Sequence, residues 1–155
     1  AVPQGQVRVI EEPARPYVFL RENVILEKEI DFLLKKLEGQ HQDYIKVIGS
    51  QTMGAVLDGE SLKRGLWNHF SCVFFLTPPG GPRDALLPAG QYARLFYRGG
   101  YDRLDRHLET LFRNVRDLGL VPAAPPLELY RVDVHDTRHE EEYVTELQVL
   151  VKPVS

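Results

Sequence analysis

One glutamate, Glu128, has the surroundings of a carboxylate that could do chemistry. It lies in the apolar segment Leu127-Glu-Leu-Tyr-Arg-Val132, whose pattern predicts a strand. Side chains alternate along a strand, so Glu128 shares a face with Tyr130 and Val132. A buried carboxylate at this place either holds a proton or binds a cation, because an unpaired buried charge is costly. The alternative is a charge at the rim of the sheet that pairs with an arginine.

Amphipathic aromatic residues accompany this glutamate along the chain. Such rings stack on flat ligands and attract cations with roughly 0.5 to 2 kcal/mol each. Taken singly, each ring also fits a position in the hydrophobic core. The set comprises Trp67, Tyr92, Tyr97, Tyr101, Tyr130 and Tyr143.

Two histidines invite a metal-binding interpretation. His135 and His139 stand four residues apart beside three glutamates, a spacing that would share one face of a helix. The segment is highly polar, however, and falls between two predicted strands, which is typical of an exposed hairpin loop. No metal site is therefore expected.

Nucleophilic and phosphate-binding chemistry has even less support. Ser71 and Cys72 lie in an apolar strand without the glycines of a nucleophile elbow, and Cys72 is expected to pack in the core. The pairs Gly80-Gly81 and Gly99-Gly100 lack the spacing of a phosphate-binding loop. Neither a catalytic residue nor a cofactor is predicted.

The elements that must position these residues form two similar series. In the first half, residues 6–26 read as extended structure interrupted by Pro13 and Pro16. An amphipathic helix over 30–37, which Gly39 ends, and strands over 44–57 and 70–76 follow.

The second half repeats this order after the break at Pro78-Pro-Gly-Gly-Pro82. It comprises a strand over 91–97, a helix that opens after Gly99-Gly100 and stops at Gly119, and strands over 127–132 and 143–151. We therefore expect one α+β domain over residues 1–155, with pseudo-repeats at about 1–77 and 86–155. The two β-α-β-β units would form one curved antiparallel sheet, with two helices packed on one face and a ligand cleft on the other.

Composition limits the function classes. The 155 residues suffice for one core, and no apolar stretch approaches the roughly 20 residues of a membrane span. The chain has 19 basic and 22 acidic residues without a basic cluster, so direct DNA binding is not expected. A cytoplasmic protein is predicted. The absence of an initiator methionine before Ala1 suggests a piece of a longer protein.

Four segments together resemble the GyrI-like effector-binding domain of MerR-type and AraC-type bacterial transcription regulators. They are Leu87-Pro-Ala-Gly-Gln-Tyr-Ala93, Gly99-Gly-Tyr-Asp102, Pro126-Leu-Glu-Leu-Tyr130 and Glu141-Glu-Tyr-Val-Thr-Glu-Leu-Gln-Val149. The first half matches more loosely, through Gly49-Ser-Gln-Thr-Met-Gly54 and Trp67-Asn-His-Phe70.

The resemblance implies a multidrug-binding pocket in which a glutamate faces lipophilic cations or aromatic molecules. That glutamate corresponds to Glu128, and Tyr101, Tyr143 and Trp67 fall at aromatic pocket positions. The predicted ligand-binding set is Glu128, Tyr143, Tyr101, Trp67, Tyr92 and Tyr130. DNA would be contacted only through an N-terminal domain absent from this sequence, and the full-length protein would be a candidate homodimer.

Two other functions stay open. Some relatives of this fold resemble hydrolases of strained electrophilic toxins, in which Glu128 would activate water beside Tyr143. Gyrase-inhibiting relatives suggest a standalone protein-binding module, whose acidic loop over Glu140–Glu142 would mimic a polyanion.

Overall fold

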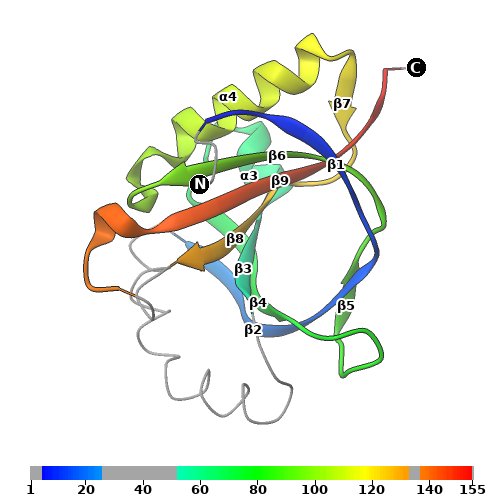
Figure 1. Ribbon diagram of the computed structural model, residues 1–155, viewed down its shortest axis with the longest axis vertical. Helices are drawn as coiled ribbons and strands as arrows, with labels where there is room; N and C mark the ends of the chain where they lie inside the picture. The colour runs from blue at the N-terminus through cyan, green and yellow to red at the C-terminus, as the bar shows by residue number, and fades with distance from the viewer. Residues whose placement is uncertain (1–4, 26–51, 133–136, 155) are drawn as a thin grey trace.

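The computed structural model describes residues 5–25, 52–132 and 137–154, and it shows an α+β fold (Figure 1). The strands are β1 (Arg8–Glu12), β2 (Arg15–Ile25), β3 (Met53–Leu57), β4 (His69–Leu76), β5 (Ala85–Leu87), β6 (Gly90–Arg98), β7 (Leu120–Pro122), β8 (Leu127–Val132) and β9 (Val144–Pro153). The helices are α3 (Gly59–Lys63), α4 (Leu104–Asp117) and the short 3-10 turns η1 (Tyr101–Arg103) and η2 (Glu140–Glu142).

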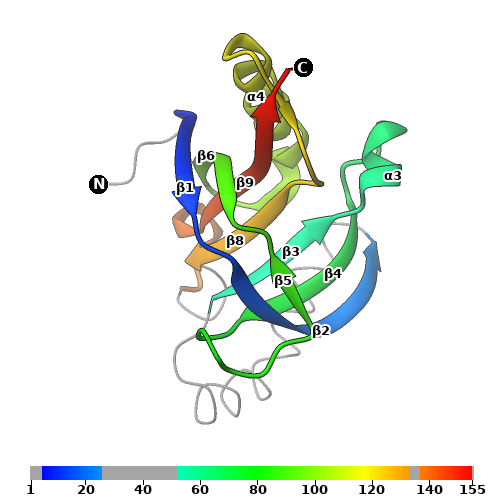
Figure 2. The same ribbon diagram turned by 90° about the vertical axis from the view of Figure 1, so that its right-hand side faces the viewer.

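All strand pairs are antiparallel, and the sheet order is β1-β6-β9-β8-β3-β4-β2-β5, with β7 paired to β9. Strands β1 and β2 follow each other along the chain, but β1 stands at one end of this order and β2 next to the other end, so the sheet curls strongly (Figure 2). The predicted curved antiparallel sheet is confirmed.

The sheet order also shows the two halves of the chain. Three strands of the first half lie in the order β3-β4-β2, and three of the second half mirror them as β8-β9-β6. The halves meet where β3 pairs with β8, with Ala55 opposite Glu128. The glutamate singled out by the sequence is therefore at the junction of the halves.

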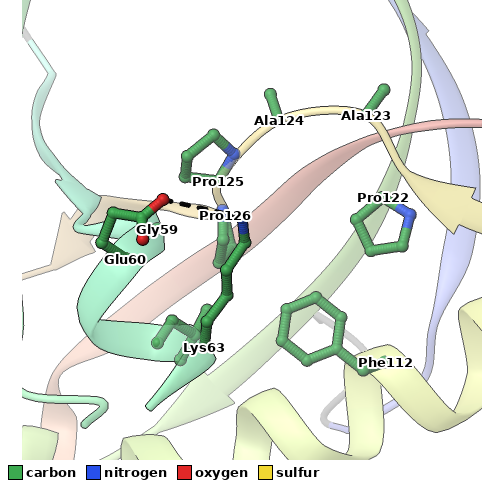
Figure 3. A pocket seen from close by; sticks show the side chains of 10 residues that line it. Gly59, Glu60, Lys63, Phe112, Pro122, Ala123, Ala124, Pro125 and Pro126 are labelled. Atoms are coloured by element: carbon green, nitrogen blue, oxygen red, sulfur yellow. Dashed lines mark ion pairs between the residues drawn. The ribbon is translucent and has the colours of Figure 1, made fainter. Parts of the chain in front are cut away.

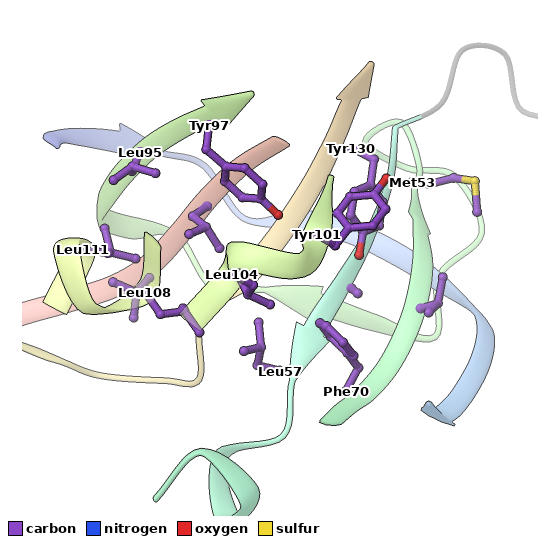
Figure 4. Close-up of a cluster of buried hydrophobic side chains, with 14 of the residues drawn as sticks. Met53, Leu57, Phe70, Leu95, Tyr97, Tyr101, Leu104, Leu108, Leu111 and Tyr130 are labelled. Atoms are coloured by element: carbon purple, nitrogen blue, oxygen red, sulfur yellow. The ribbon is translucent and has the colours of Figure 1, made fainter. Parts of the chain in front are cut away.

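One face of the sheet is covered by α4. Its apolar side chains recur at helical spacing and are buried in one cluster with Leu95 of β6 and Leu147 of β9. Figure 4 shows Leu95 on the same side of the sheet as the helix residues Leu108 and Leu111. These helix residues are Leu104, Leu108, Leu111 and Val115. The helix stops before Gly119, which has a φ of 73° that favours glycine. Leu62 of α3 packs against the same cluster.

The opposite face carries a second buried cluster and a polar chain. The cluster comprises Cys72, Phe74, Leu87, Tyr92, Leu127 and Leu129, so Cys72 packs in the core as expected. Beside it, Glu146 accepts hydrogen bonds from Arg131 (2.9 Å) and Gln148 (2.7 Å), and Gln148 also donates to Glu12 (2.9 Å). This polar chain ties β8 and β9 to the end of β1.

Some local expectations differ from the structure. Helix α3 lies between the predicted strands 44–57 and 70–76, where no helix was predicted, and Asp58 caps it by accepting from the Ser61 backbone N–H (3.0 Å). Strands β5 and β7, of three residues each, were not predicted. The helix predicted over 30–37 and the predicted strand residues 44–51 lie outside the described residues. No described helix has the length and apolarity to cross a membrane.

Candidate functional site

Glu128 is fully buried on the face of the sheet that α4 covers. Its neighbours across β3 and β9 are Ala55 and Leu147, both also fully buried. Residues directly opposite each other in neighbouring strands point to the same face. The carboxylate is therefore surrounded by apolar side chains of the core.

Two phenols hold the carboxylate. Tyr97 donates a hydrogen bond to Oε1 of Glu128, and Tyr130 donates to Oε2, each at 2.8 Å. Burial and the nearby carboxylate raise the pKa of both tyrosines well above 10, so they remain donors. Among the described residues, no basic side chain forms an ion pair with Glu128.

Burial dominates the protonation of Glu128. Desolvation raises the pKa of its carboxyl from 4.5 to about 7, although the hydrogen bonds from Tyr130 and Tyr97 lower it. Near neutral pH the site thus holds either a proton or an unpaired negative charge.

Two further tyrosines extend the ring of aromatic groups. The Tyr101 ring centre is 5.4 Å from that of Tyr130 and 5.8 Å from that of Tyr143. In Figure 4, the Tyr97 hydroxyl points toward the Tyr101 and Tyr130 rings. We call Glu128 with Tyr97, Tyr101, Tyr130 and Tyr143 the tyrosine cage.

The double glycine before Tyr101 places two members of the tyrosine cage. Gly99 has a φ of 101°, and its N–H donates to the carbonyl of Tyr143 at 2.9 Å. A Cβ on Gly100 would collide with the side chain of Glu140. The turn therefore brings Tyr101, at the start of η1, against the segment that carries Tyr143.

The structure brings together four of the six predicted ligand residues, namely Glu128, Tyr101, Tyr130 and Tyr143. The ligand cleft was expected on the face opposite the helices, whereas Glu128 lies on the face that α4 covers. Tyr92 lies on that face, where it donates to the carbonyl of Pro88 (2.6 Å) and lies under the Arg15 guanidinium. Trp67 is half-buried after α3 and packs against the core cluster, and no described contact joins it to Glu128.

Tyr97 and His107 were not among the predicted ligand residues. The sequence contained a signal for Tyr97, because it alternates with Leu95 and Ala93, and all three are buried. His107, on α4, stacks on the Tyr97 ring with a centroid distance of 4.2 Å and an interplanar angle of 13°. Its only sequence signal is a position beside the apolar face of the helix.

No cluster of metal-ligating side chains was found within the described part of the chain. His139 is exposed and lies 3.7 Å from Glu141, and His135 falls outside the described residues. The turn Glu140–Glu142 is exposed, as expected of a loop.

A groove of about 620 Å³ opens elsewhere, between α3, α4 and the loop 122–126 (Figure 3). Phe112 and all five residues of that loop line it, and an exposed ion pair of Glu60 and Lys63 (3.6 Å) lies at its edge. Glu128 does not line it. The groove is therefore separate from the tyrosine cage.

Solved structures share this fold. The crystal structure of the EcmrR C-terminal domain is 19% identical, with a TM-score of 0.68 over 96% of this chain and 98% of that chain. A cryo-EM structure of an EcmrR–DNA complex is 18% identical, with a TM-score of 0.72 over 96% of this chain. There the chain spans only 58% of the length of EcmrR.

Two other proteins are similar at lower identity. A hydrolase from Listeria innocua is 8% identical, with a TM-score of 0.64 over 98% of this chain and 94% of that chain. SAV2435 bound to tetraphenylphosphonium is 12% identical, with a TM-score of 0.53 over 95% of this chain and 94% of that chain. At these identities the likeness is one of fold.

No match was found among curated proteins. The model of the GyrI-like small molecule binding domain, however, matches residues 5–152, which is almost the whole chain. The match includes both halves of the curled sheet and every member of the tyrosine cage. The chain belongs to the GyrI-like family of small-molecule-binding domains.

Proposed function

We propose that this domain binds lipophilic cations in the tyrosine cage and serves as the effector-binding part of a transcription regulator. The observation that carries the proposal is the buried carboxylate of Glu128, which has two phenolic donors and no basic partner among the described residues. A cationic ligand would supply the missing positive charge.

The rings around Glu128 suit such a ligand. Tyr101, Tyr130 and Tyr143 present aromatic faces that attract a cation and tolerate many ligand shapes. One carboxylate demands positive charge and little else, so the expected selectivity is broad. The tetraphenylphosphonium bound to SAV2435 has this chemistry.

Entry of a ligand requires movement of the cage. Each of the four tyrosines is at most 5% exposed, so they exclude water from Glu128 in the unliganded state. Tyr101 and Tyr143 belong to a turn and a loop end, which makes them the members that can move with least disturbance of the sheet. Ligand binding would then change the position of the η1 turn.

An attached DNA-binding domain would change its orientation in response to such a shift of the η1 turn. The similarity to EcmrR, seen in complex with DNA, supports this role for a longer protein that would contain this domain. Transcription responds only if the ligand binds two states of the regulator with different affinities.

The test is a titration of the domain with tetraphenylphosphonium at pH 8 and fixed salt. Glu128→Gln should bind at least about tenfold more weakly, or roughly 1.4 kcal/mol. Glu146→Gln is the matched control, because Glu146 is a buried glutamate on the opposite face of the neighbouring strand. Equal affinities of wild type and Glu128→Gln would refute the proposal.

A hydrolase is the second candidate, favoured by the pKa of about 7 at Glu128, which suits a general base at neutral pH. The similarity to the Listeria hydrolase agrees with it in fold. Turnover of an epoxide or another strained electrophile that disappears in Glu128→Gln would support it. Reversible, stoichiometric binding without turnover would favour the sensor.

A further inference from the structure

His107 lies next to the tyrosine cage without belonging to it. The residue is half-buried on α4, beside the buried Leu104 and Leu108. Its ring is nearly parallel to the Tyr97 ring, at 4.2 Å. One face of the phenol that donates to Glu128 is therefore covered by an imidazole.

This stack can fix the direction of the Tyr97 hydrogen bond. A phenol ring that rotates away from its position moves its hydroxyl by several ångströms, whereas the bond to Glu128 requires 2.8 Å. A site residue is held in place when its own rotamer is locked by packing. The imidazole supplies that packing from the helix side.

The ring also brings a titratable charge. Burial and Arg103 lower the pKa of His107 below 6.5, while Asp105 and Asp102 act in the opposite direction. The group that faces it from β6 is Tyr97. His107 is thus neutral at pH 8, and below its lowered pKa it becomes a cation that lies directly against the phenol bonded to Glu128.

We propose that His107 is a positioning residue of the ligand site, which holds the Tyr97 hydroxyl on Glu128 and, when protonated, disfavours a bound cation. The effect on the cation rests on the function proposed above. The effect on Glu128 does not, because it concerns the unliganded protein.

The first experiment follows the carboxyl carbon of Glu128 by NMR in unliganded protein labelled with ¹³C-glutamate. Tyr97→Phe removes a donor to the carboxylate and should raise the titration midpoint by about one pH unit. His107→Ala should raise the midpoint by roughly half as much, because the Tyr97 phenol is no longer held in place. His107→Phe, which keeps a ring, should restore the wild-type midpoint.

The matched control is Asn114→Ala, which alters another half-buried polar residue two turns further along α4. It should leave the midpoint unchanged. Urea unfolding would verify that each variant is folded, and His107→Gln would replace His107→Ala if that variant were not. A wild-type midpoint in the variants that lack the ring would overturn the positioning role.

The second experiment measures tetraphenylphosphonium affinity at pH 8 and pH 5.5. At pH 8, His107→Ala should bind several-fold more weakly than wild type, and His107→Phe should bind equally well. Between the two pH values, the affinity of wild type should fall several-fold more than that of His107→Phe, which cannot become charged. Identical pH profiles would overturn the role of the charge.

The two experiments separate the two proposals. If the NMR midpoints shift as expected but neither wild type nor any variant binds tetraphenylphosphonium, the proposed function fails and the positioning role stands. If Glu128→Gln loses the cation but neither midpoint nor affinity responds to His107, the role of His107 fails alone.

Discussion

The Tyr97 hydroxyl on β6 lies 2.8 Å from Oε1 of Glu128 on β8, although β9 runs between these two strands. A tyrosine is long enough to cross above the intervening strand. The position facing Glu128 on β9 is Leu147, which supplies no polar group. The second phenol, Tyr130, comes from β8 itself and donates to the other oxygen, also at 2.8 Å. The carboxylate is thus held from two directions within an apolar layer.

The stability of the protein should depend on the protonation of Glu128. Its pKa is about 7 in the folded protein against an ordinary 4.5, so the folded state binds the extra proton between these values. The stabilisation is fully present below pH 4.5 and is lost as the pH rises to 7. Its size is about 3 kcal/mol.

Urea unfolding of wild type and Glu128→Gln between pH 5 and pH 8 measures this effect. Glutamine does not titrate, and the other ionisable groups cancel in the comparison. The free energy of unfolding of wild type should fall relative to the variant as the pH rises. A difference that is the same at pH 5 and pH 8 would mean that Glu128 titrates at its ordinary pKa.

Binding of a cation should release a proton below neutral pH. At pH 6 Glu128 is mostly protonated, and a permanent cation such as tetraphenylphosphonium favours the carboxylate. Calorimetry in two buffers of different ionisation enthalpy should show the release of close to one proton at pH 6 and almost none at pH 8. Equal heats in both buffers at pH 6 would contradict the expectation.

The sequence predicted the strand of Glu128 with the bounds that the structure has, and it predicted correctly that Tyr130 shares its face. The sequence did not show which of the aromatic residues lie beside Glu128. Tyr92 and Tyr97 are five residues apart on one strand, so they must face opposite sides, but alternation does not tell which side carries Glu128. That depends on the register of β6, β9 and β8, which joins residues far apart in the chain.

Trp67 and His107 illustrate a second limit. The position of Trp67 depends on α3, a helix of five residues that is too short for a periodic pattern. His107 stands beside the apolar stripe of α4, where a helical pattern does not distinguish a solvated side chain from one that packs on a neighbour. Both positions are set by tertiary packing.

Tyr92→Phe should leave cation binding unchanged, because Tyr92 lies in the buried cluster on the opposite face of the sheet. The substitution removes the hydrogen bond to the carbonyl of Pro88 and should lower the free energy of unfolding by about 1 kcal/mol. Urea unfolding and tetraphenylphosphonium titration measure the two quantities. A large loss of affinity with unchanged stability would return Tyr92 to the ligand site.

Gly54→Ala should disturb the junction that carries Glu128. Gly54 lies on β3, and an added Cβ would stand 2.5 Å from the backbone oxygen of Glu128 and 2.5 Å from Cζ of Phe74. Phe74 is fully buried, and the oxygen belongs to the backbone of the neighbouring strand, so neither can move freely. Overpacking of this kind costs about 1 to 3 kcal/mol.

Gly59→Ala is the control for this substitution. Its Cβ would meet only Pro125, at 3.2 Å, and alanine favours the helix in which Gly59 lies. Gly54→Ala should unfold at a clearly lower urea concentration than Gly59→Ala, and the NMR signal of the Glu128 carboxyl should shift only in Gly54→Ala. If Gly54→Ala is as stable as wild type, then β3 and β8 leave more room beside the Glu128 backbone than the 2.5 Å contact implies.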